Sequence, residues 1–156
     1  MNKKEEIFKK LELTKISQIG VVVRNLEKTI EYYENILGLG KFVKPKINFF
    51  NISYYENEVK SKWLLAFCSM KQFELELIQP TVEPTIYHDF LKEKGEGIHH
   101  LGFDIEDLEK KISICKEYGI QIMQKGERKG GKFAYLDTRE LGGIIFELIQ
   151  RDNRFI

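Results

Sequence analysis

Several residue types are scarce in this chain of 156 residues, and each scarcity excludes a class of protein. The two cysteines, Cys68 and Cys115, lie far apart and outside any CxxC motif, so we expect reduced thiols in a cytoplasmic protein. No apolar run approaches the roughly 18 residues that a membrane-spanning helix needs. The first ten residues mix both charge signs without an apolar stretch, which argues against a secretory signal. With only three histidines, any metal site must rely mainly on carboxylates or amides.

An excess of charge of one sign is also missing. Lys and Arg number 25 against 24 Asp and Glu, which leaves a net charge of +1. Nucleic acids and membrane surfaces attract proteins with a clear basic excess, so we expect neither as a partner. Apolar residues make up 42% of the chain, which excludes disordered and collagen-like classes. The length fits one compact domain, or two small modules that share a core.

The strongest feature of the sequence is an internal repeat. Residues 16–30 and 98–112 are offset by 82 positions and carry the same residue at six of fifteen positions. A second match, Glu-Leu-Ile-Gln, occurs at 76–79 and again at 147–150. Because the halves begin alike and end alike, we expect two modules of the same architecture.

Each half reads as a strand, a helix and three further strands. Asn25 and Asp107 follow the first strands and suit N-caps, while Gly38 and Gly119 suit left-handed helix ends. A short helix about 86–94 is expected to join the halves. The first dozen residues suit a solvated helix with Ile7, Phe8 and Leu11 on one face. The strands are expected at 16–23, 42–55, 63–68 and 73–79 in the first half, and at 98–105, 120–124, 132–137 and 143–150 in the second.

Four polar residues fall on strand faces turned away from the predicted helices: Gln18, Glu76, His100 and Glu147. They form two repeat-equivalent pairs, Gln18 with His100 and Glu76 with Glu147. If the two sheets curve toward each other, the four side chains converge. The adjacent His99 faces the helix, and we expect it to be a packed or capping residue.

Glu147 is the most informative of the four residues, because its strand is otherwise continuously apolar. A buried, unpaired carboxylate costs several kcal/mol or takes up a proton, so Glu147 needs a cation or a hydrogen-bond partner. The alternative is a wet strand face on which Glu147 is an ordinary surface residue. The repeat equivalence with Glu76 favours the site. Glu74 lacks that support and is assigned to solvent.

Three segments carry a resemblance to a known family: 18–38, 95–103 and 141–149. The first resembles the opening of vicinal oxygen chelate proteins, which include glyoxalase I, methylmalonyl-CoA epimerase, extradiol dioxygenases and the fosfomycin and bleomycin resistance proteins. The other two are especially similar to the epimerase branch. The resemblance implies an α+β, glyoxalase-like fold in which two βαβββ modules with mixed sheets curve into a metal-binding cup. It divides the chain into an N-terminal extension 1–13, a single domain 14–150 built of modules 14–80 and 97–150 joined by 81–96, and a tail 151–156.

The resemblance also implies a ligand set for one divalent metal ion: Gln18, Glu76, His100 and Glu147. Many relatives have histidine where this chain has Gln18, although some glyoxalase I enzymes have glutamine. One nitrogen and three oxygens suit Zn, Ni, Co, Mn or Mg, and they argue against an iron dioxygenase, which needs two histidines and one carboxylate.

The implied activity is that of a metal-dependent isomerase or lyase. A glutamate takes a proton next to a metal-polarised carbonyl and returns it, with Glu147 as the base and Glu76 as a possible partner. Glyoxalase I (lactoylglutathione lyase) and methylmalonyl-CoA epimerase both fit, so the substrate is a thiol adduct of a 2-oxoaldehyde or an acyl-CoA. The alternatives are a metal-free, drug-sequestering protein of the bleomycin-resistance kind and a fosfomycin-type thiol transferase; the converging glutamates argue against the first and Gln18 against the second. The family often forms homodimers, so the resemblance also implies a homodimer for this chain.

Substrate-binding residues are less sharply indicated. The segment 125–132 gathers cations around three glycines, and Arg128, Lys129 and Lys132 could meet a coenzyme A phosphate or a glutathione carboxylate. A solvated hairpin loop explains the same composition equally well. Several aromatic residues fit either the lining of the cup or the core: Tyr54, Tyr55, Trp63, Phe67 and Tyr135.

Overall fold

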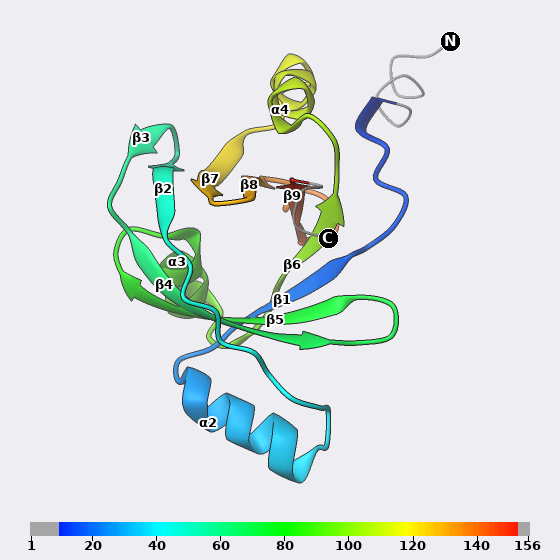
Figure 1. Ribbon diagram of the computed structural model, residues 1–156. Helices are drawn as coiled ribbons and strands as arrows, with labels where there is room; N and C mark the ends of the chain where they lie inside the picture. Colours follow the sequence, from blue (N-terminus) through cyan, green and yellow to red (C-terminus); the bar gives the residue numbers. More distant parts are fainter. Residues whose placement is uncertain (1–9, 153–156) are drawn as a thin grey trace.

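The computed structural model describes residues 10–152, and in this range one mixed, nine-stranded sheet curls back on itself (Figure 1). The curled sheet with its few helices confirms the expected α+β class. No helix of the described residues is long and apolar enough to cross a bilayer. The elements in chain order are β1 (Gln18–Val22), α2 (Leu26–Glu31), η1 (Tyr32–Ile36), β2 (Phe49–Tyr54), β3 (Asn57–Glu58), β4 (Lys62–Ser69), β5 (Glu74–Val82), α3 (Ile86–Glu93), β6 (Gly97–Asp104), α4 (Leu108–Glu117), β7 (Ile122–Arg128), β8 (Gly131–Leu136) and β9 (Ile145–Arg151).

The two halves of the chain meet at the centre of the sheet. The strand order is β3-β2-β7-β8-β9-β6-β1-β5-β4. In each half the first strand pairs in parallel with the last, β1 with β5 and β6 with β9, and the two first strands pair antiparallel with each other. The sequence led us to expect two separate sheets facing each other. They are one continuous sheet, because β1 and β6 are hydrogen-bonded neighbours.

The expected strand 42–55 is wrong in its length and unexpected in its pairing. Only Phe49–Tyr54 forms β2. Earlier in the same stretch, Val43 forms an isolated bridge with Phe67. Pro45 lies between the two pieces, and proline has no N–H to donate to a sheet. β2 then pairs with β7 of the other half, while its counterpart β7 pairs with β8 of its own half. Residues 44–48 therefore connect the bridge to β4, at one edge of the sheet, with β2 near the other edge.

The helix ends follow the sequence signals. Asn25 and Asp107 each accept a hydrogen bond from the backbone N–H three residues further on, which confirms both N-caps. Gly38 and Gly119 have φ values of 66° and 76°, so both adopt the left-handed conformation predicted for them. The first helix differs in one respect, because its last turn is the π-helix η1.

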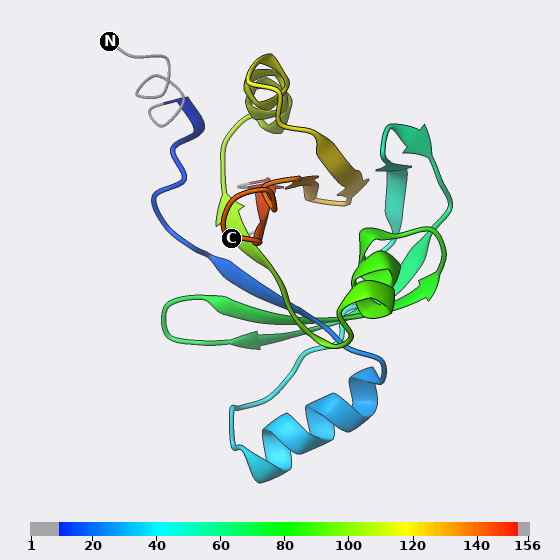
Figure 2. The same ribbon diagram turned by 180° about the vertical axis from the view of Figure 1, so that it is seen from behind.

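Three apolar clusters hold the sheet and helices together. Leu26 of α2 packs with Val23, Ala66 and Leu77 on the outer face of β1, β4 and β5. α4 covers β7, β8 and β9 on the side of the molecule opposite α2 (Figure 1). The third helix, α3, packs against β1 and β5 (Figure 2). The third cluster fills the inside of the curl, where Tyr87 of α3 meets residues of β1, β4, β5, β7, β8 and β9.

The N-terminal extension and the cysteines complete the packing. Leu11 is buried against α4, and most of the helix expected over the first dozen residues, with Ile7 and Phe8, lies outside the described residues. Cys68 and Cys115 are both free and buried.

Candidate metal centre

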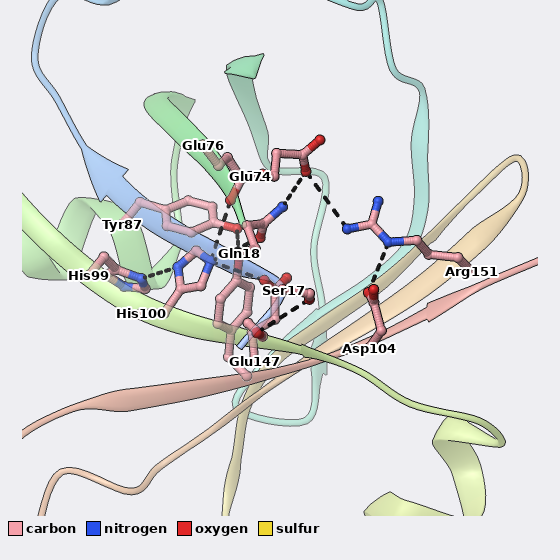
Figure 3. Close-up of polar contacts among 12 residues, drawn as sticks. Ser17, Gln18, Glu74, Glu76, Tyr87, His99, His100, Asp104, Glu147 and Arg151 are labelled. Carbon is pink, nitrogen blue, oxygen red and sulfur yellow. Dashed lines mark hydrogen bonds and ion pairs between the residues drawn. The ribbon is translucent and has the colours of Figure 1, made fainter. Parts of the chain in front are cut away.

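The sheet register brings the four predicted ligand residues to one point inside the curl. They come from β5, β1, β6 and β9, which are consecutive neighbours in the sheet (Figure 3). All four side chains are buried, with exposed fractions of 4% for Gln18, 6% for Glu76, 0% for His100 and 5% for Glu147. These four side chains therefore lie on the inner strand faces that alternation along each strand predicts. Such burial of two carboxylates requires compensation.

Two repeat-equivalent glycines make the convergence possible. Gly20 lies opposite His100 in the β1–β6 pair, and Gly102 lies opposite Gln18. A Cβ on Gly20 would fall 1.9 Å from His100 Cε1, and one on Gly102 would fall 2.9 Å from Gln18 Cβ. Each glycine thus leaves the space into which the ligand-type residue of the other half folds.

The polar atoms of the site converge on one imidazole nitrogen. His100 Nε2 lies 3.0 Å from Glu147 Oε2, 3.4 Å from Glu76 Oε2 and 3.3 Å from Gln18 Oε1. A single N–H cannot serve three acceptors, and both carboxylate Oε2 atoms are buried without a hydrogen-bond partner in residues 10–152. A divalent cation would satisfy these oxygens and the nitrogen lone pair together. The donor atoms of Glu76, His100 and Glu147 lie within 4.8 Å of one another, so the set fits a metal ion.

The electrostatics of the site show the same need for a cation. Burial, together with the nearby Glu147 charge, raises the pKa of Glu76 to about 7 although His100 opposes the shift. Burial lowers the pKa of His100, but the two carboxylates outweigh it and bring that pKa to about 9. In the metal-free protein the imidazole therefore holds a proton as the partial substitute for a cation.

Gln18 is held in place by residues that the sequence did not single out. Its Nε2 donates to Glu74 Oε1 at 3.0 Å, which turns the amide oxygen toward His100. Glu74 also lies 3.7 Å from the Arg151 guanidinium, which in turn donates to Asp104 (Figure 3). The assignment of Glu74 to solvent is therefore wrong. Alternation placed Glu74 on the correct face, but only the β1–β5 register shows that it lies opposite Gln18.

His99 lies directly behind His100. Its ring is buried among Tyr87, Phe90 and Tyr135, as expected for a packed residue. His99 Nδ1 also lies 3.1 Å from His100 Nδ1, so one nitrogen donates to the other. Burial lowers the pKa of His99 well below its usual range, which keeps this ring neutral. A neutral acceptor behind Nδ1 leaves Nε2 of His100 free to face the oxygens.

Two buried tyrosines complete the wall of the site, and sequence analysis did not assign Tyr87 to it. The Tyr87 hydroxyl donates to Tyr135 Oη at 2.9 Å, and both rings line the cavity beside Glu147. Burial and the two glutamates raise both tyrosine pKa values well above the usual range, so neither ring ionises near neutral pH. Tyr87 comes from the joining helix, where its position on an apolar face was the only signal.

A cavity of about 50 Å³ opens onto Gln18, Glu76 and Glu147. Of the predicted substrate residues, Arg128 and Lys132 line it, whereas Lys129 is exposed at the β7–β8 turn and does not. The expected loop 125–132 is largely the end of β7 and the start of β8. Among the aromatic candidates, Trp63, Phe67 and Tyr135 line the cavity, and Tyr54 and Tyr55 pack instead against the inner core.

Comparison with known proteins identifies the class to which this fold and site belong. The model of the glyoxalase/bleomycin resistance protein/dioxygenase superfamily matches residues 17–135, so the chain belongs to that superfamily.

Individual relatives are more distant. The chain is 27% identical over 141 residues to uncharacterized protein YqjC of Bacillus subtilis (strain 168), covering 88% of this chain and 93% of that protein. It is 24% identical over 141 residues to an ethylmalonyl-CoA/methylmalonyl-CoA epimerase of Cereibacter sphaeroides, covering 87% and 97%. A solved structure of a methylmalonyl-CoA epimerase in complex with methylmalonyl-CoA and NH4+ superposes with a TM-score of 0.63 at 22% identity, covering 89% of this chain and 95% of the other.

Proposed function

We propose that this protein is a metal-dependent epimerase of a 2-substituted malonyl-type thioester of coenzyme A. Catalysis removes a proton from the carbon next to the thioester carbonyl and returns one to the opposite face. The metal ligands are Gln18, Glu76, His100 and Glu147, which supply one nitrogen and three oxygens. Support for the acyl-CoA class over the glutathione class comes from relatives whose names state that they are malonyl-CoA-type epimerases.

The observation that carries the proposal is the pair of buried carboxylates with unpartnered oxygens, Glu76 Oε2 and Glu147 Oε2. They enter the site from β5 and β9, which flank the β1–β6 pair on opposite sides. Inverting a stereocentre by proton transfer requires a base on one face of the carbon and an acid on the other. Glu76 and Glu147 line the same small cavity from these two strands, which supports their assignment as this acid–base pair.

Each residue of the site then has a defined task. Released from the metal ion, Glu147 is the base that takes the proton, and Glu76 takes a proton from water and returns it to the opposite face of the carbon. Glu147 then loses its proton to water, which restores the site. A divalent ion held by the four residues would supply Lewis-acid polarisation of the thioester carbonyl, which makes the neighbouring C–H more acidic. Tyr87 and Tyr135 keep their protons and exclude water from this wall of the cavity.

The acyl group is held from the β7–β8 side. Arg128 and Lys132 line the same small cavity as the two glutamates, and each can pair with a free carboxylate on the acyl group. A malonyl-type acyl group carries such a carboxylate. Lys129, which is exposed outside the cavity, has no role in this proposal.

Deuterium exchange tests the proposed reaction. We expect the metal-loaded protein to incorporate deuterium from D₂O at the 2-carbon of methylmalonyl-CoA, as followed by mass spectrometry. Glu147→Gln, which keeps the size of the side chain but cannot accept the proton, should slow exchange at least about 100-fold. The matched variant Glu140→Gln, at an exposed position on the loop before β9, should exchange at the wild-type rate.

The same substrate panel separates the alternatives. Turnover of the hemithioacetal of methylglyoxal and glutathione, with no exchange into methylmalonyl-CoA, would replace the epimerase by a glyoxalase I activity. Absence of divalent metal binding at micromolar concentrations would favour the metal-free binding protein. Exchange that persists unchanged in Glu147→Gln would overturn the assigned base.

A further inference from the structure

A second and much larger cavity adjoins the metal centre. It has a volume of about 720 Å³ and lies between residues 44–52 and the strands β3 and β4. Ile47, Phe49, Trp63 and Leu65 line both this cavity and the small one at the metal centre. The Phe49 and Trp63 rings stack with centroids 4.6 Å apart, so this pair stands between the two spaces. The two cavities are therefore neighbours that share these four lining residues.

The rim of the large cavity is basic although the whole chain is nearly neutral. Four lysines line it (Lys44, Lys46, Lys60 and Lys62) against two acids (Glu27 and Glu58). Only Lys44 is held in an ion pair, with Glu27 at 2.7 Å. Within residues 10–152 the other three lysines form no ion pair, and all three are exposed. These three lysines outnumber Glu58, the acid of the rim besides the paired Glu27, so the rim is suited to an anion with several charges.

The walls of the same cavity are apolar and aromatic. Phe50 and Leu64 line it with exposed fractions of 48% and 50%, which is unusual for large apolar side chains. Phe49 and Trp63 lie deeper. Flat aromatic ligands stack on such surfaces, and phosphates are held by lysine ammonium groups. The combination is therefore complementary to a purine ring that carries several phosphates.

We propose that the large cavity binds the 3′-phosphorylated adenine nucleotide of coenzyme A, while the acyl end of the same molecule reaches the metal centre. This assignment rests on the proposed function for the identity of the acyl end. Glutathione carries neither a purine ring nor phosphates and would leave both the lysine rim and the aromatic wall without partners. The large cavity thus selects coenzyme A as the carrier of the substrate.

Nucleotide binding can be measured without metal and without turnover. The EDTA-treated protein is titrated with adenosine 3′,5′-bisphosphate and with coenzyme A, by calorimetry and by the fluorescence of Trp63, the only tryptophan in the chain. We expect saturable binding that weakens with added salt and that perturbs Trp63. The triple variant Lys46→Glu/Lys60→Glu/Lys62→Glu should bind both ligands at least ten-fold more weakly. The matched variant Lys71→Glu/Lys92→Glu/Lys110→Glu, at exposed positions outside the cavity, should bind as the wild type does.

Other ligands distinguish the carrier from a free nucleotide. We expect coenzyme A to bind more tightly than ATP and S-hexylglutathione not to displace it; tighter binding of ATP would overturn the carrier assignment. Equal affinity of both triple variants, each shown to be folded by circular dichroism, would overturn the cavity assignment. Nucleotide binding without deuterium exchange would refute the epimerase and leave this inference standing. Deuterium exchange with an unchanged KM for methylmalonyl-CoA in the variant Lys46→Glu/Lys60→Glu/Lys62→Glu would support the epimerase and refute this inference.

Discussion

At the scale of single residues, the site depends on which nitrogen of His100 carries the proton. Its Nε2 faces the oxygens of Gln18, Glu76 and Glu147. This nitrogen can bind a metal only when it carries no proton, because the lone pair must be free. The proton must then be on Nδ1, where His99 Nδ1 lies 3.1 Å away to accept it. His99 is therefore a positioning residue for the proposed metal centre.

Two substitutions at His99 separate positioning from packing. His99→Leu fills the buried space but offers no acceptor, so we expect the affinity for Mn²⁺ to fall about 10- to 100-fold. His99→Asn places an amide oxygen near the Nδ1 position and should restore most of that affinity. Isothermal titration measures both, with circular dichroism as the check on folding. Equal losses in the two variants would mean that His99 acts only through packing.

At the scale of the strands, the repeat explains why two glycines face two ligand-type side chains. Gly20 and Gly102 occupy equivalent positions in β1 and β6, and each lies opposite the polar residue that begins the other half's pattern. The same register places Gly20 beside Glu76 and Gly102 beside Glu147. Neither glycine has a positive φ, so the backbone conformation does not require glycine here. Glycine is required because a side chain would have no room.

Adding one methyl group at Gly20 tests this packing. The new Cβ would fall 1.9 Å from His100 Cε1, so Gly20→Ala must push the imidazole away from the oxygens. We expect metal affinity to drop at least about ten-fold. Gly38→Ala is the control, because its φ of +66° strains the backbone by roughly 1 kcal/mol while no atom lies near the added methyl. It should lower the melting temperature and leave the metal affinity unchanged; a Gly20→Ala variant with wild-type affinity would refute the packing argument.

The strands also show what a sequence can and cannot reveal. Period-two alternation and the repeat were sufficient to place Gln18, Glu76, His100 and Glu147 on inner strand faces, because alternation is read within one strand and the repeat by comparing the two halves of the sequence. The pairing of β2 with β7 is a contact between distant segments that leaves no periodic trace. Glu74 was missed for the same reason: its partner Gln18 is set by the register between β1 and β5, which only the folded sheet defines.

At the scale of the whole molecule, an almost neutral chain gathers charged groups at two neighbouring sites. Two carboxylates and one imidazole are buried at the metal centre, and unpaired lysines surround the neighbouring cavity. The buried cluster links the stability of the protein to pH, because its groups titrate differently in the folded and unfolded chains. The homodimer and the cytoplasmic location remain predictions at this scale, and sedimentation equilibrium is the measurement for the first.

The metal-free protein should lose stability as the pH rises from 7 to 9.5. His100 has a pKa of about 9 when folded and 6.5 when unfolded. A group with a raised pKa stabilises the folded state fully below the lower value, and that stabilisation is lost as the pH rises through the higher one. We expect a decrease on the order of a few kcal/mol in the free energy of unfolding, measured with urea in EDTA. His100→Asn should remove this slope.

Saturating Mn²⁺ should act in the opposite direction. Its ligands must be deprotonated, so metal binding strengthens as protons leave His100 and Glu76. The stabilisation added by the metal should therefore grow between pH 7 and 8.5. A constant increment across this range would mean that the ion binds elsewhere.

The proposed function depends on one divalent ion that is held by two residues from each half of the repeat. Anomalous diffraction from a crystal of the Mn²⁺-loaded protein locates such an ion. We expect a single strong peak inside the curled sheet, roughly 2.0–2.3 Å from Gln18 Oε1, His100 Nε2 and one oxygen each of Glu76 and Glu147. A crystal grown with saturating Mn²⁺ that shows no peak between these four side chains, or a peak at other residues, would contradict it.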